Sequence, residues 1–506
     1  MRSMTPARSE PTAAPGEAMV PNAPLTSPWP PRHEGLRIGG EIVRHDRVLE
    51  VRNPATGELA GTVAMATAGD VHRACELAAE HRSRLTRQQR YSILMSAREL
   101  IDQHREQWAR LITTESGLCL KDTFHEVGRT CDVLLAAAHQ VLLDDGQVFA
   151  GDVTAGAKPR RVFTMREPLL GVIAAITPFN HPLNQVAHKV APAVATNNRV
   201  VLKPSEKTPL TALAFADTLV EAGLPPEMVQ VVVGEPAEIC AQLLGDSRVE
   251  LLSFTGSTHV GKLIAAQSGY RRIVLELGGI DPAIVLDDAD LAEAARLAAQ
   301  GAYRNSGQRC TAVKRILVHE RVAEEFVCLL LQETRQLTCG DPLDPATDVG
   351  TVIDRSAAQR IAATVDDAVR MGAAVLHGGV PAGAYYPPTV VDLVRPEMPL
   401  VNEEVFGPVS PVIRFAEDDQ AIQIANSIRY ALSAAVFTRS LDRALRFITD
   451  LHAGTVNVGE VPGHRLEFTP FGGIKDSGLG YKEGVIETMK AYTNVRTYSL
   501  PWPVAR

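Results

Sequence analysis

A cysteine near the middle of the chain stands directly after an arginine, in the segment NSGQRCTAVKR at residues 305–315. A thiol with a purely structural role is expected among apolar neighbours, whereas a nucleophilic thiolate is expected beside positive charge and small residues. Because Arg309 would lower the cost of the thiolate form, we predict that Cys310 is a reactive cysteine.

Two other residues could take part in the same chemistry. Glu276, in VLELGGIDP, precedes Cys310 by 34 positions, and Asn180 lies in ITPFNHPLN. A carboxylate can act as a general base, and a side-chain amide can donate a hydrogen bond to an oxyanion. Either residue alone is usually structural, but a Cys, a Glu and an Asn at strand ends or loops of one α/β unit indicate covalent catalysis.

Two segments are candidates for nucleotide binding. SFTGSTHVGK, residues 253–262, is a glycine-rich turn between an apolar strand and a helix, which suits a phosphate at a helix N-terminus. It is not a P-loop, because Leu263 stands where a hydroxyl should bind magnesium, and a plain strand–helix turn explains it equally well. In VVLKPSEKTP, Lys203 and Glu206 could hold a ribose or could form a solvated loop pair.

The elements that must position these residues alternate in type from about residue 171 onward. Short β-branched runs read as strands: GVIAAIT, NRVVLKP, MVQVVVGE, VELLSFTG, RRIVLELGG and PAIVL. Between them, PLTALAFADTLVEAG has helix-start signals at Thr208 and Pro209 and a stop at Gly223. This alternation predicts an α/β fold with a mostly parallel sheet and helices on both faces.

The rest of the chain divides into further segments. Residues 64–148 carry a helical pattern, and a second α/β block follows residue 281, with helices near 288–303, 321–337 and 356–371. The strand-like end KAYTNVRTYSL is too short to fold alone, so we expect it to pair with another subunit. Residues 1–32, rich in Pro, Ala and Ser, are expected to be a disordered leader.

Composition restricts the functional class. The 506 residues are 45% hydrophobic and carry a formal net charge of −8, which argues against non-specific nucleic-acid binding. No apolar run reaches about 18 residues, so no membrane span is predicted. The seven cysteines form no C-x-x-C pair and no metal-ligand spacing, which favours a cytoplasmic protein without a metal site.

The motifs TPFNHPL, LKPSEKTPL, FTGSTHVG, LELGGIDP, NSGQRCTAVKR, NEEVFGPVSPV and PFGGIKDSGLG resemble, in this order, those of the NAD(P)-dependent aldehyde dehydrogenase superfamily. The resemblance runs from about residue 38 to 498. It implies a Rossmann-type NAD-binding domain (33–145 and 167–278), an α/β catalytic domain (279–472) and a small β oligomerisation flap (146–166 and 485–506). A homodimer or homotetramer is the expected assembly.

The resemblance also implies roles for individual residues. Cys310 would be the nucleophile, Glu276 the general base, and Asn180 the oxyanion donor, helped by the Cys310 backbone N–H. The thiolate would attack an aldehyde, hydride would pass to the nicotinamide, and the resulting thioester would be hydrolysed. The expected coenzyme contacts are Ile176, Thr177, Pro178, Phe179, Lys203, Ser205, Glu206, Gly234, Phe254, Gly256, Ser257, Val260, Leu277, Glu404 and Phe406.

The expected substrate pocket is unusually basic. The family pattern places Arg129, Arg309 and Arg465 around the aldehyde's tail, together with His181 and Thr311. Several arginines around one cavity repel each other unless an anion neutralises them, and a guanidinium matches the oxygens of a phosphate or phosphonate. The alternative is local pairing, in which Glu126 holds Arg129 and Glu467 holds Arg465.

Within the superfamily the sequence resembles the phosphonoacetaldehyde dehydrogenases most, through TPFNHPLN, GQRCTAVKR and PGHRLEFTPFGGIKDSGLGYKEG. Glu206 favours NAD, because its carboxylate would repel a 2′-phosphate and accept from a free 2′-hydroxyl. We therefore predict NAD-dependent oxidation of phosphonoacetaldehyde, a small anionic aldehyde, to phosphonoacetate. Non-phosphorylating glyceraldehyde-3-phosphate dehydrogenase, lactaldehyde dehydrogenase and succinate-semialdehyde dehydrogenase remain the alternatives.

Overall fold

The structure is a computed structural model that describes residues 31–143 and 146–502. Most of the predicted leader, residues 1–30, lies outside the described residues. Its last position, Arg32, is the first residue of strand β1 (Arg32–Glu34), which pairs in parallel with β5 (Leu59–Ala64). Strand β4 (Val48–Arg52) completes this three-stranded sheet.

The first large sheet has seven strands in the order β12-β11-β8-β9-β10-β2-β3. Its five parallel strands are β8 (Val172–Ile176), β9 (Val200–Lys203), β10 (Val229–Val231), β11 (Val249–Thr255) and β12 (Arg272–Glu276). The antiparallel strands β2 (Leu36–Ile38) and β3 (Glu41–Val43) extend one edge. Since the order reverses between β8 and β11, a ligand crevice is expected at the carboxyl ends of these two strands.

Among the described residues, nine α-helices and one short 3₁₀ helix pack against this sheet and one another. One group of helices in contact consists of α2 (Arg87–Gln103), α4 (Leu120–Val141), α5 (Asn184–Ala195) and α6 (Pro209–Glu221). Separately, α1 (Ala68–Glu80) contacts α7 (Pro236–Gly245). Helix α3 (Arg105–Ser116) packs on α4 and α6, and α8 (Thr258–Gln267) follows β11. The short η1 (Pro226–Met228) leads into β10, and α15 (Val485–Ala491) packs on α5. Together they enclose one large apolar core.

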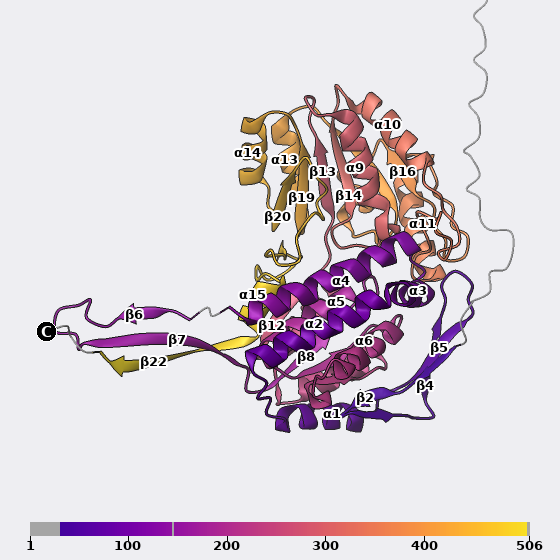
Figure 1. The fold of residues 1–506 in the computed structure, drawn as a ribbon. Coiled ribbons are helices and arrows are strands. Elements are labelled where there is room, and N and C mark those ends of the chain that lie inside the picture. The colour runs from indigo at the N-terminus through magenta and orange to yellow at the C-terminus, as the bar shows by residue number, and fades with distance from the viewer. Residues whose placement is uncertain (1–30, 144–145, 503–506) are drawn as a thin grey trace, which may run out of the picture.

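The second large sheet also has seven strands, in the order β15-β16-β17-β14-β13-β19-β20, and lies above the first in Figure 1. Its strands are β13 (Asp281–Val285), β14 (Val313–His319), β15 (Ala374–His377), β16 (Thr389–Asp392), β17 (Val409–Phe415), β19 (Ser433–Phe437) and β20 (Thr455–Val458). All pairings are parallel except β15 with β16.

The helices of this second unit are α9 (Leu291–Tyr303), α10 (Ala323–Arg335), α11 (Arg355–Arg370), α12 (Pro399–Asn402), α13 (Asp418–Asn426) and α14 (Leu441–Asp450). A two-stranded antiparallel ladder pairs β18 (Tyr430–Ala431), which precedes β19 in the chain, with β21 (Ile474–Lys475), which follows β20. Two separate apolar clusters form the interior of this unit.

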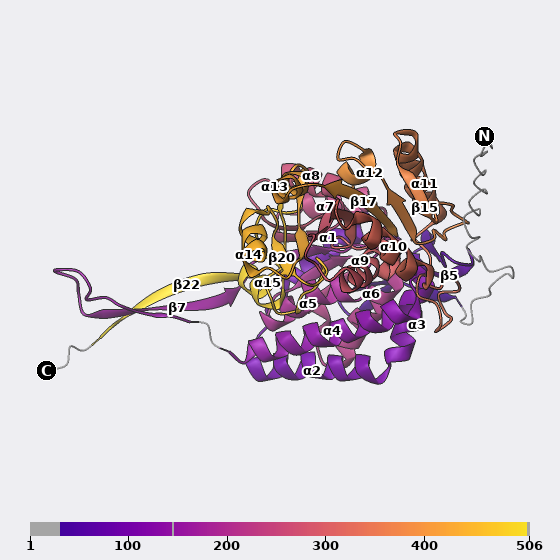
Figure 2. The same ribbon diagram turned by 90° about the horizontal axis from the view of Figure 1, so that it is seen from above.

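A three-stranded arm projects from the body (Figures 1 and 2). It consists of β6 (Val148–Ala150), β7 (Arg160–Pro168) and β22 (Thr493–Pro501). We expected the C-terminal strand to pair with another subunit, but β22 pairs with β7 of its own chain over its full length. Pairing within the chain satisfies one edge of β22 and leaves large apolar side chains such as Phe149, Leu500 and Trp502 exposed on the arm.

Candidate active site

Cys310 follows a tightly constrained loop between α9 and β14. Three consecutive residues, Asn305, Ser306 and Gly307, have left-handed backbones with φ of 59°, 51° and 69°. The loop is held because the Asn305 N–H donates to Asp122 Oδ2 at 2.6 Å. A Cβ at position 307 would collide with the Gly407 carbonyl, so only glycine fits there.

Asn180 forms hydrogen bonds with this loop through both its side-chain amide and its backbone carbonyl. Its Nδ2 donates to the Gln308 carbonyl at 2.8 Å, and its own carbonyl accepts from Asn305 Nδ2 at 2.9 Å. Gln308 is fixed in turn, because its Oε1 accepts from the Ile353 N–H at 2.9 Å. The segment after β8 and the segment before Cys310 therefore form one rigid unit.

The thiol of Cys310 is not activated in the way that the sequence predicted. Burial raises its pKa to about 11, and the positive charges that oppose this most are Lys314 and Arg465. Arg309, expected to be the main cation, interacts with the sulfur as well, since Cys310 raises the pKa of its guanidinium. Burial nevertheless outweighs these charges, so the thiol is protonated at neutral pH.

Glu276 ends β12 in a buried position. Neither carboxyl oxygen has a hydrogen-bond partner among the described residues. Burial, followed by the neighbouring Glu483, raises its pKa well above the usual value, while Lys189 is the strongest opposing charge. Lys189 Nζ lies 2.7 Å from Glu483 Oε1. A buried carboxyl group whose pKa is shifted in this way, beside a buried ion pair, is a candidate for proton transfer.

Several predicted coenzyme residues lie at the carboxyl ends of β8 and β11. Thr177 follows β8, its N–H donates to the Lys203 carbonyl at 3.1 Å, and its Oγ1 is buried without a partner among the described residues. Gly256 and Ser257 connect β11 to α8, where Ser257 is the N-cap and accepts from the Val260 N–H at 3.4 Å. A free hydroxyl and an open helix N-terminus at a switch point fit a dinucleotide phosphate.

Lys203 ends β9 and is almost wholly buried, and its Nζ lies 3.4 Å from Glu206 Oε2. The Glu206 side chain is one of the more exposed here, at 31%. Lys203 and Glu206 are therefore not a fully solvated loop pair, because Lys203 is buried at the end of a strand. The Glu206 carboxylate remains accessible to a ribose.

Glu404 and Phe406 approach from the second unit. Lys314 Nζ lies 2.5 Å from Glu404 Oε1, which also accepts from the Gly279 N–H at 3.3 Å. Phe406 meets Phe179 edge to face, with ring centroids 5.9 Å apart. These contacts join the loop after β8 to the second sheet.

The remaining predicted coenzyme residues lie at or just beyond strand ends, or in the first turn of a helix. They are Ile176, Pro178, Ser205, Gly234, Phe254, Leu277 and Val260.

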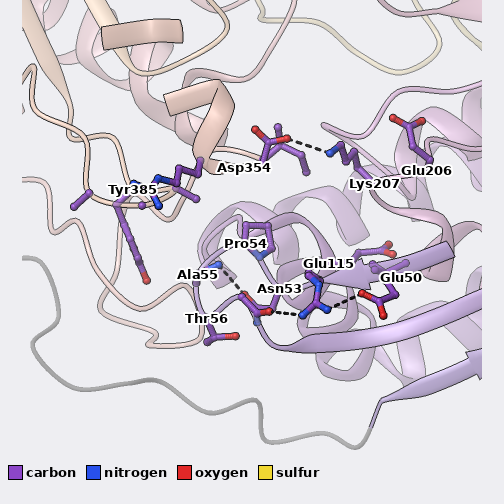
Figure 3. Close-up of a pocket in the computed structure, with 18 residues that line it drawn as sticks. Glu50, Asn53, Pro54, Ala55, Thr56, Glu115, Glu206, Lys207, Asp354 and Tyr385 are labelled. Atoms are coloured by element: carbon purple, nitrogen blue, oxygen red, sulfur yellow. Dashed lines mark hydrogen bonds and ion pairs between the residues drawn. The ribbon is translucent and has the colours of Figure 1, made fainter. Parts of the chain in front are cut away.

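A cavity of about 670 Å³ lies beside Glu206 (Figure 3). The loop at residues 53–57 lies on one side, and Asp354 and Tyr385 lie on the other. Among the residues that line the cavity, Lys207 and Asp354 form an ion pair, with Lys207 Nζ 3.1 Å from Asp354 Oδ2. Apart from Glu206, none of the predicted site residues lines this cavity.

A second cavity, of about 550 Å³, brings together the three predicted arginines Arg129, Arg309 and Arg465. Their convergence was predicted, although the chain separates the first from the last by more than 300 residues. A fourth arginine, Arg304, and His125 line the same cavity and were not predicted. The acidic lining residues are Asp132, Glu460 and Glu467.

The ion pairs around these arginines differ from those considered for the sequence. Arg129 Nε donates to Glu467 Oε1, whereas Glu126 accepts the Leu183 and Asn184 N–H groups at 2.8 and 3.0 Å. Arg465 forms no hydrogen bond among the described residues, and its Cζ lies 3.8 Å from the Phe471 ring centroid. Of the three predicted arginines, Arg129 is therefore the one that pairs with a carboxylate among the described residues.

Arg309 is also incompletely satisfied. One terminal nitrogen donates to the Gly301 carbonyl at 2.5 Å, while its buried Nε has no partner among the described residues. His181 and Thr311, predicted to contact substrate, are buried but do not line the cavity. His181 Nδ1 instead lies 3.4 Å from Glu126 Oε2.

Residues 42–498 match the aldehyde dehydrogenase family over nearly the whole described chain. The chain is a member of the aldehyde dehydrogenase family. It is 37% identical over 473 residues to the 3-sulfolactaldehyde dehydrogenase of Priestia aryabhattai, covering 93% of this chain and 99% of the relative.

Two solved structures are also similar to this aldehyde dehydrogenase. An NADP-dependent glyceraldehyde-3-phosphate dehydrogenase from Bacillus halodurans complexed with NADP has a TM-score of 0.89 and 34% identity, covering 93% of this chain and 100% of the other. An NAD-dependent aldehyde dehydrogenase from Sinorhizobium meliloti has a TM-score of 0.88 and 31% identity, covering 94% and 96%. The predicted fold and enzyme class are confirmed.

The substrates in the names of these relatives differ from one another, and phosphonoacetaldehyde is not among them. Within the described residues of this aldehyde dehydrogenase, no helix is long and apolar enough to cross a membrane. Over the same residues, no group of three or more His, Cys, Asp or Glu side chains could hold a metal ion.

Proposed function

We propose that this aldehyde dehydrogenase oxidises a short aldehyde carrying a tetrahedral anionic group, with phosphonoacetaldehyde as the substrate and NAD as the coenzyme. The single observation that carries the proposal is the cavity lined by Arg129, Arg309 and Arg465. Its arginines retain N–H donors that no described residue accepts, above all the buried Nε of Arg309.

The charge of the cavity supports an anionic ligand. Arg129 is neutralised by Glu467, but Arg309 and Arg465 have no carboxylate within ion-pair distance among the described residues. Burial, followed by the nearby Arg304, lowers the pKa of Arg309 to about 10. A buried guanidinium without a carboxylate partner is stabilised when an anion binds to it. A phosphonate offers several oxygen acceptors to its parallel N–H donors.

The reaction follows from the residues around Cys310. The Cys310 thiol first releases its proton to solvent. The sulfur then forms a bond to the aldehyde carbon, and the π electrons of the carbonyl move to its oxygen, which becomes an oxyanion. Asn180 already donates to Gln308 through its Nδ2, so the same amide has a second N–H for that oxyanion. Such a donor contributes about 3–4 kcal/mol to the transition state.

Glu276 would act as the base that takes a proton from water when the thioester is hydrolysed. Its carboxyl oxygens have no partner among the described residues, which leaves them free to orient a water molecule. The nearby Lys189, Arg465 and Lys482 favour its ionised form. The anionic tail would meanwhile be held by the arginines, which positions the carbonyl carbon for attack.

In this proposal, NAD would occupy the crevice between β8 and β11. Ser257 and the α8 N-terminus would hold its pyrophosphate, Lys203 and Glu206 its adenosine ribose, and Glu404 its nicotinamide ribose. When bound, the nicotinamide ring supplies the hydride acceptor. Glu206 favours NAD over NADP, since a carboxylate beside the ribose would repel a 2′-phosphate.

Two alternative substrates have specific support. The relative named for 3-sulfolactaldehyde is 37% identical, and a sulfonate presents three oxygens in the same arrangement as a phosphonate. The structural neighbour named for glyceraldehyde 3-phosphate is 34% identical, but it is NADP-dependent. Glu206 therefore weighs against the phosphate aldehyde, whereas the sulfonate aldehyde is the stronger alternative.

The experiment is a substrate panel measured by NADH formation. Phosphonoacetaldehyde, 3-sulfolactaldehyde, glyceraldehyde 3-phosphate, succinate semialdehyde, lactaldehyde and propanal would be compared, with Cys310→Ala as the inactive control. We expect kcat/KM for phosphonoacetaldehyde to exceed that for propanal by about 100-fold or more. A preference for propanal or lactaldehyde would refute an anionic substrate, and a preference for 3-sulfolactaldehyde would replace the phosphonate by a sulfonate.

We also propose that the arm mediates a homodimer or homotetramer. Its exposed apolar residues, including Phe149, Leu500 and Trp502, support this assembly, because monomers rarely expose such surface. The division into a coenzyme-binding unit, a catalytic unit and an arm is part of the same proposal.

A further inference from the structure

Lys314 is a buried lysine to which the proposed reaction gives no role. It is the second residue of β14, a strand whose residues are all buried, and 3% of its side chain is exposed. A charged group in such a position is costly unless a carboxylate and hydrogen-bond acceptors surround it. The partners of its ammonium group therefore indicate its role.

The Lys314 ammonium contacts two separate segments of the chain. Its Nζ lies 2.5 Å from Glu404 Oε1 and donates to the Gly279 carbonyl at 2.9 Å. It also lies 5.0 Å from the centroid of the Phe406 ring, within the range of a cation–π contact. Glu404 and Phe406 belong to the loop before β17, whereas Gly279 lies between β12 and β13. One cation thus joins this loop to the connection between the two large sheets.

The Glu404 carboxylate is enclosed by the same connection. Its Oε1 also accepts the Gly279 N–H at 3.3 Å, and a Cβ at Gly278 would collide with its Oε2. A Cβ at Gly279 would come within 2.8 Å of the Cys310 carbonyl oxygen. Because both glycines lack a Cβ, the carboxylate and the backbone of Cys310 pack against one short segment. The position of the carboxylate is therefore fixed relative to the cysteine.

This arrangement leaves one oxygen of Glu404 for a ligand. Lys314 and Gly279 both approach Oε1, and no described residue donates a hydrogen bond to Oε2. The Glu404 side chain is 16% exposed, so its second oxygen is accessible. Without the ammonium, the carboxylate would keep among the described residues only the longer contact with the Gly279 N–H. It would then be free to turn, and a displacement of about 1 Å is enough to weaken binding and slow a reaction.

We propose that Lys314 is a positioning residue for the coenzyme. By holding Glu404 and contacting Phe406, it would fix the place of the nicotinamide ribose and ring relative to Cys310. The inference rests on the proposed function, which assigns the nicotinamide ribose to Glu404. It adds a residue of the second sheet that was not among the predicted coenzyme contacts.

The first test measures binding without turnover. Lys314→Met removes the charge and keeps an unbranched side chain. The dissociation constants of NADH and ADP would be measured by calorimetric titration, since ADP ends before the nicotinamide ribose. We expect Kd for NADH to rise about tenfold and Kd for ADP to stay within about twofold. Lys121→Met is the matched control and should change neither constant, because Lys121 is an exposed lysine of α4 whose Nζ lies 2.6 Å from Asp348 Oδ1.

The second test is a double-mutant cycle with Glu404→Gln. This change alone should weaken NADH binding, because an amide makes weaker hydrogen bonds to the ribose hydroxyls than a carboxylate does. In that background, adding Lys314→Met should change Kd for NADH by less than about twofold, since the lysine acts through the carboxylate. Effects that multiply in full would show that Lys314 acts independently of Glu404 and would overturn the proposal.

The remaining outcomes are equally decisive. Equal weakening of NADH and ADP binding by Lys314→Met would mean that the lysine serves only the fold, and no weakening of either would remove it from coenzyme binding. If Lys314→Met does not fold, Lys314→Gln carries the same test, because its amide can still donate to the Gly279 carbonyl. Unchanged NADH binding by Glu404→Gln would refute the coenzyme assignment in the proposed function, and the role of Lys314 with it. That result is distinguishable, because it does not depend on any change at Lys314.

Discussion

His188 Nε2 lies 2.6 Å from Glu467 Oε2, and the other oxygen of the same carboxylate accepts a hydrogen bond from the Nε–H of Arg129. One buried carboxylate thereby fixes an imidazole on α5 and a guanidinium on α4. Although burial opposes its charge, Arg129 and His188 hold the pKa of Glu467 well below its usual range, so it is ionised throughout the physiological range. We therefore expect Glu467 to act as a positioning residue that orients Arg129.

This relationship gives a prediction for Glu467→Gln. The amide keeps the shape but loses the charge that holds Arg129, so KM for phosphonoacetaldehyde should rise about tenfold, which corresponds to about 1.4 kcal/mol. The kinetic constants for propanal should stay within about twofold. The control is Glu460→Gln, because Glu460 lines the same cavity but accepts from the Val461 N–H and not from Arg129. An equal loss on both aldehydes would mean that Glu467 serves only the fold.

The pairing of Arg129 with Glu467 also marks a limit of sequence reasoning. The sequence offered Glu126 for Arg129 because the two are three positions apart on a predicted helix, where ion pairs are common. In the structure, Glu126 accepts hydrogen bonds from the N–H groups at the N-terminus of α5. Arg129 pairs instead with Glu467, which lies 338 positions further along the chain. Such a long-range exchange depends on how helices pack, which local periodicity does not encode.

Other parts of the fold were accessible from the sequence. The six β-branched runs predicted as strands correspond to β8 through β13, because fully buried parallel strands need continuous apolar residues. The convergence of three arginines followed from the family resemblance and not from spacing. Arg304 was missed although it lies in the same loop, because the orientation of its side chain depends on the left-handed turn that follows it.

The reactivity of Cys310 should depend steeply on pH. Its pKa is raised to about 11 by burial, so the thiolate fraction, and with it the rate of alkylation by iodoacetamide, should rise about tenfold per pH unit between 7 and 10. Arg465→Gln removes a charge that favours the thiolate and should slow alkylation at pH 8 by about three- to tenfold. A rate that is already constant near pH 7 would show that the sulfur is activated by Arg309, as the sequence first suggested.

Coenzyme choice should depend on Glu206. Glu206→Thr removes the carboxylate that would repel a 2′-phosphate, so the ratio of kcat/KM with NADP to that with NAD should rise about tenfold. Glu238→Thr is a suitable control, because Glu238 is an exposed residue of α7 whose Oε2 lies 3.4 Å from Arg47. An unchanged ratio would remove the main argument against a glyceraldehyde 3-phosphate substrate.

The loop before Cys310 can be tested through a pair of glycines with similar backbones. Gly307 has φ of +69° and no room for a Cβ beside the Gly407 carbonyl, whereas Gly269 has φ of +58° and nothing within 4 Å. Gly269→Ala should therefore cost only the backbone strain, about 1–2 kcal/mol in the free energy of unfolding, with activity unchanged. Gly307→Ala must also displace the loop that Asn180 and Gln308 hold, so kcat should fall about 100-fold or more, because Cys310 would lose its alignment with the oxyanion donor. Thermal unfolding and steady-state rates on the two variants measure this difference, and equal effects would mean that the left-handed turn contributes to folding alone.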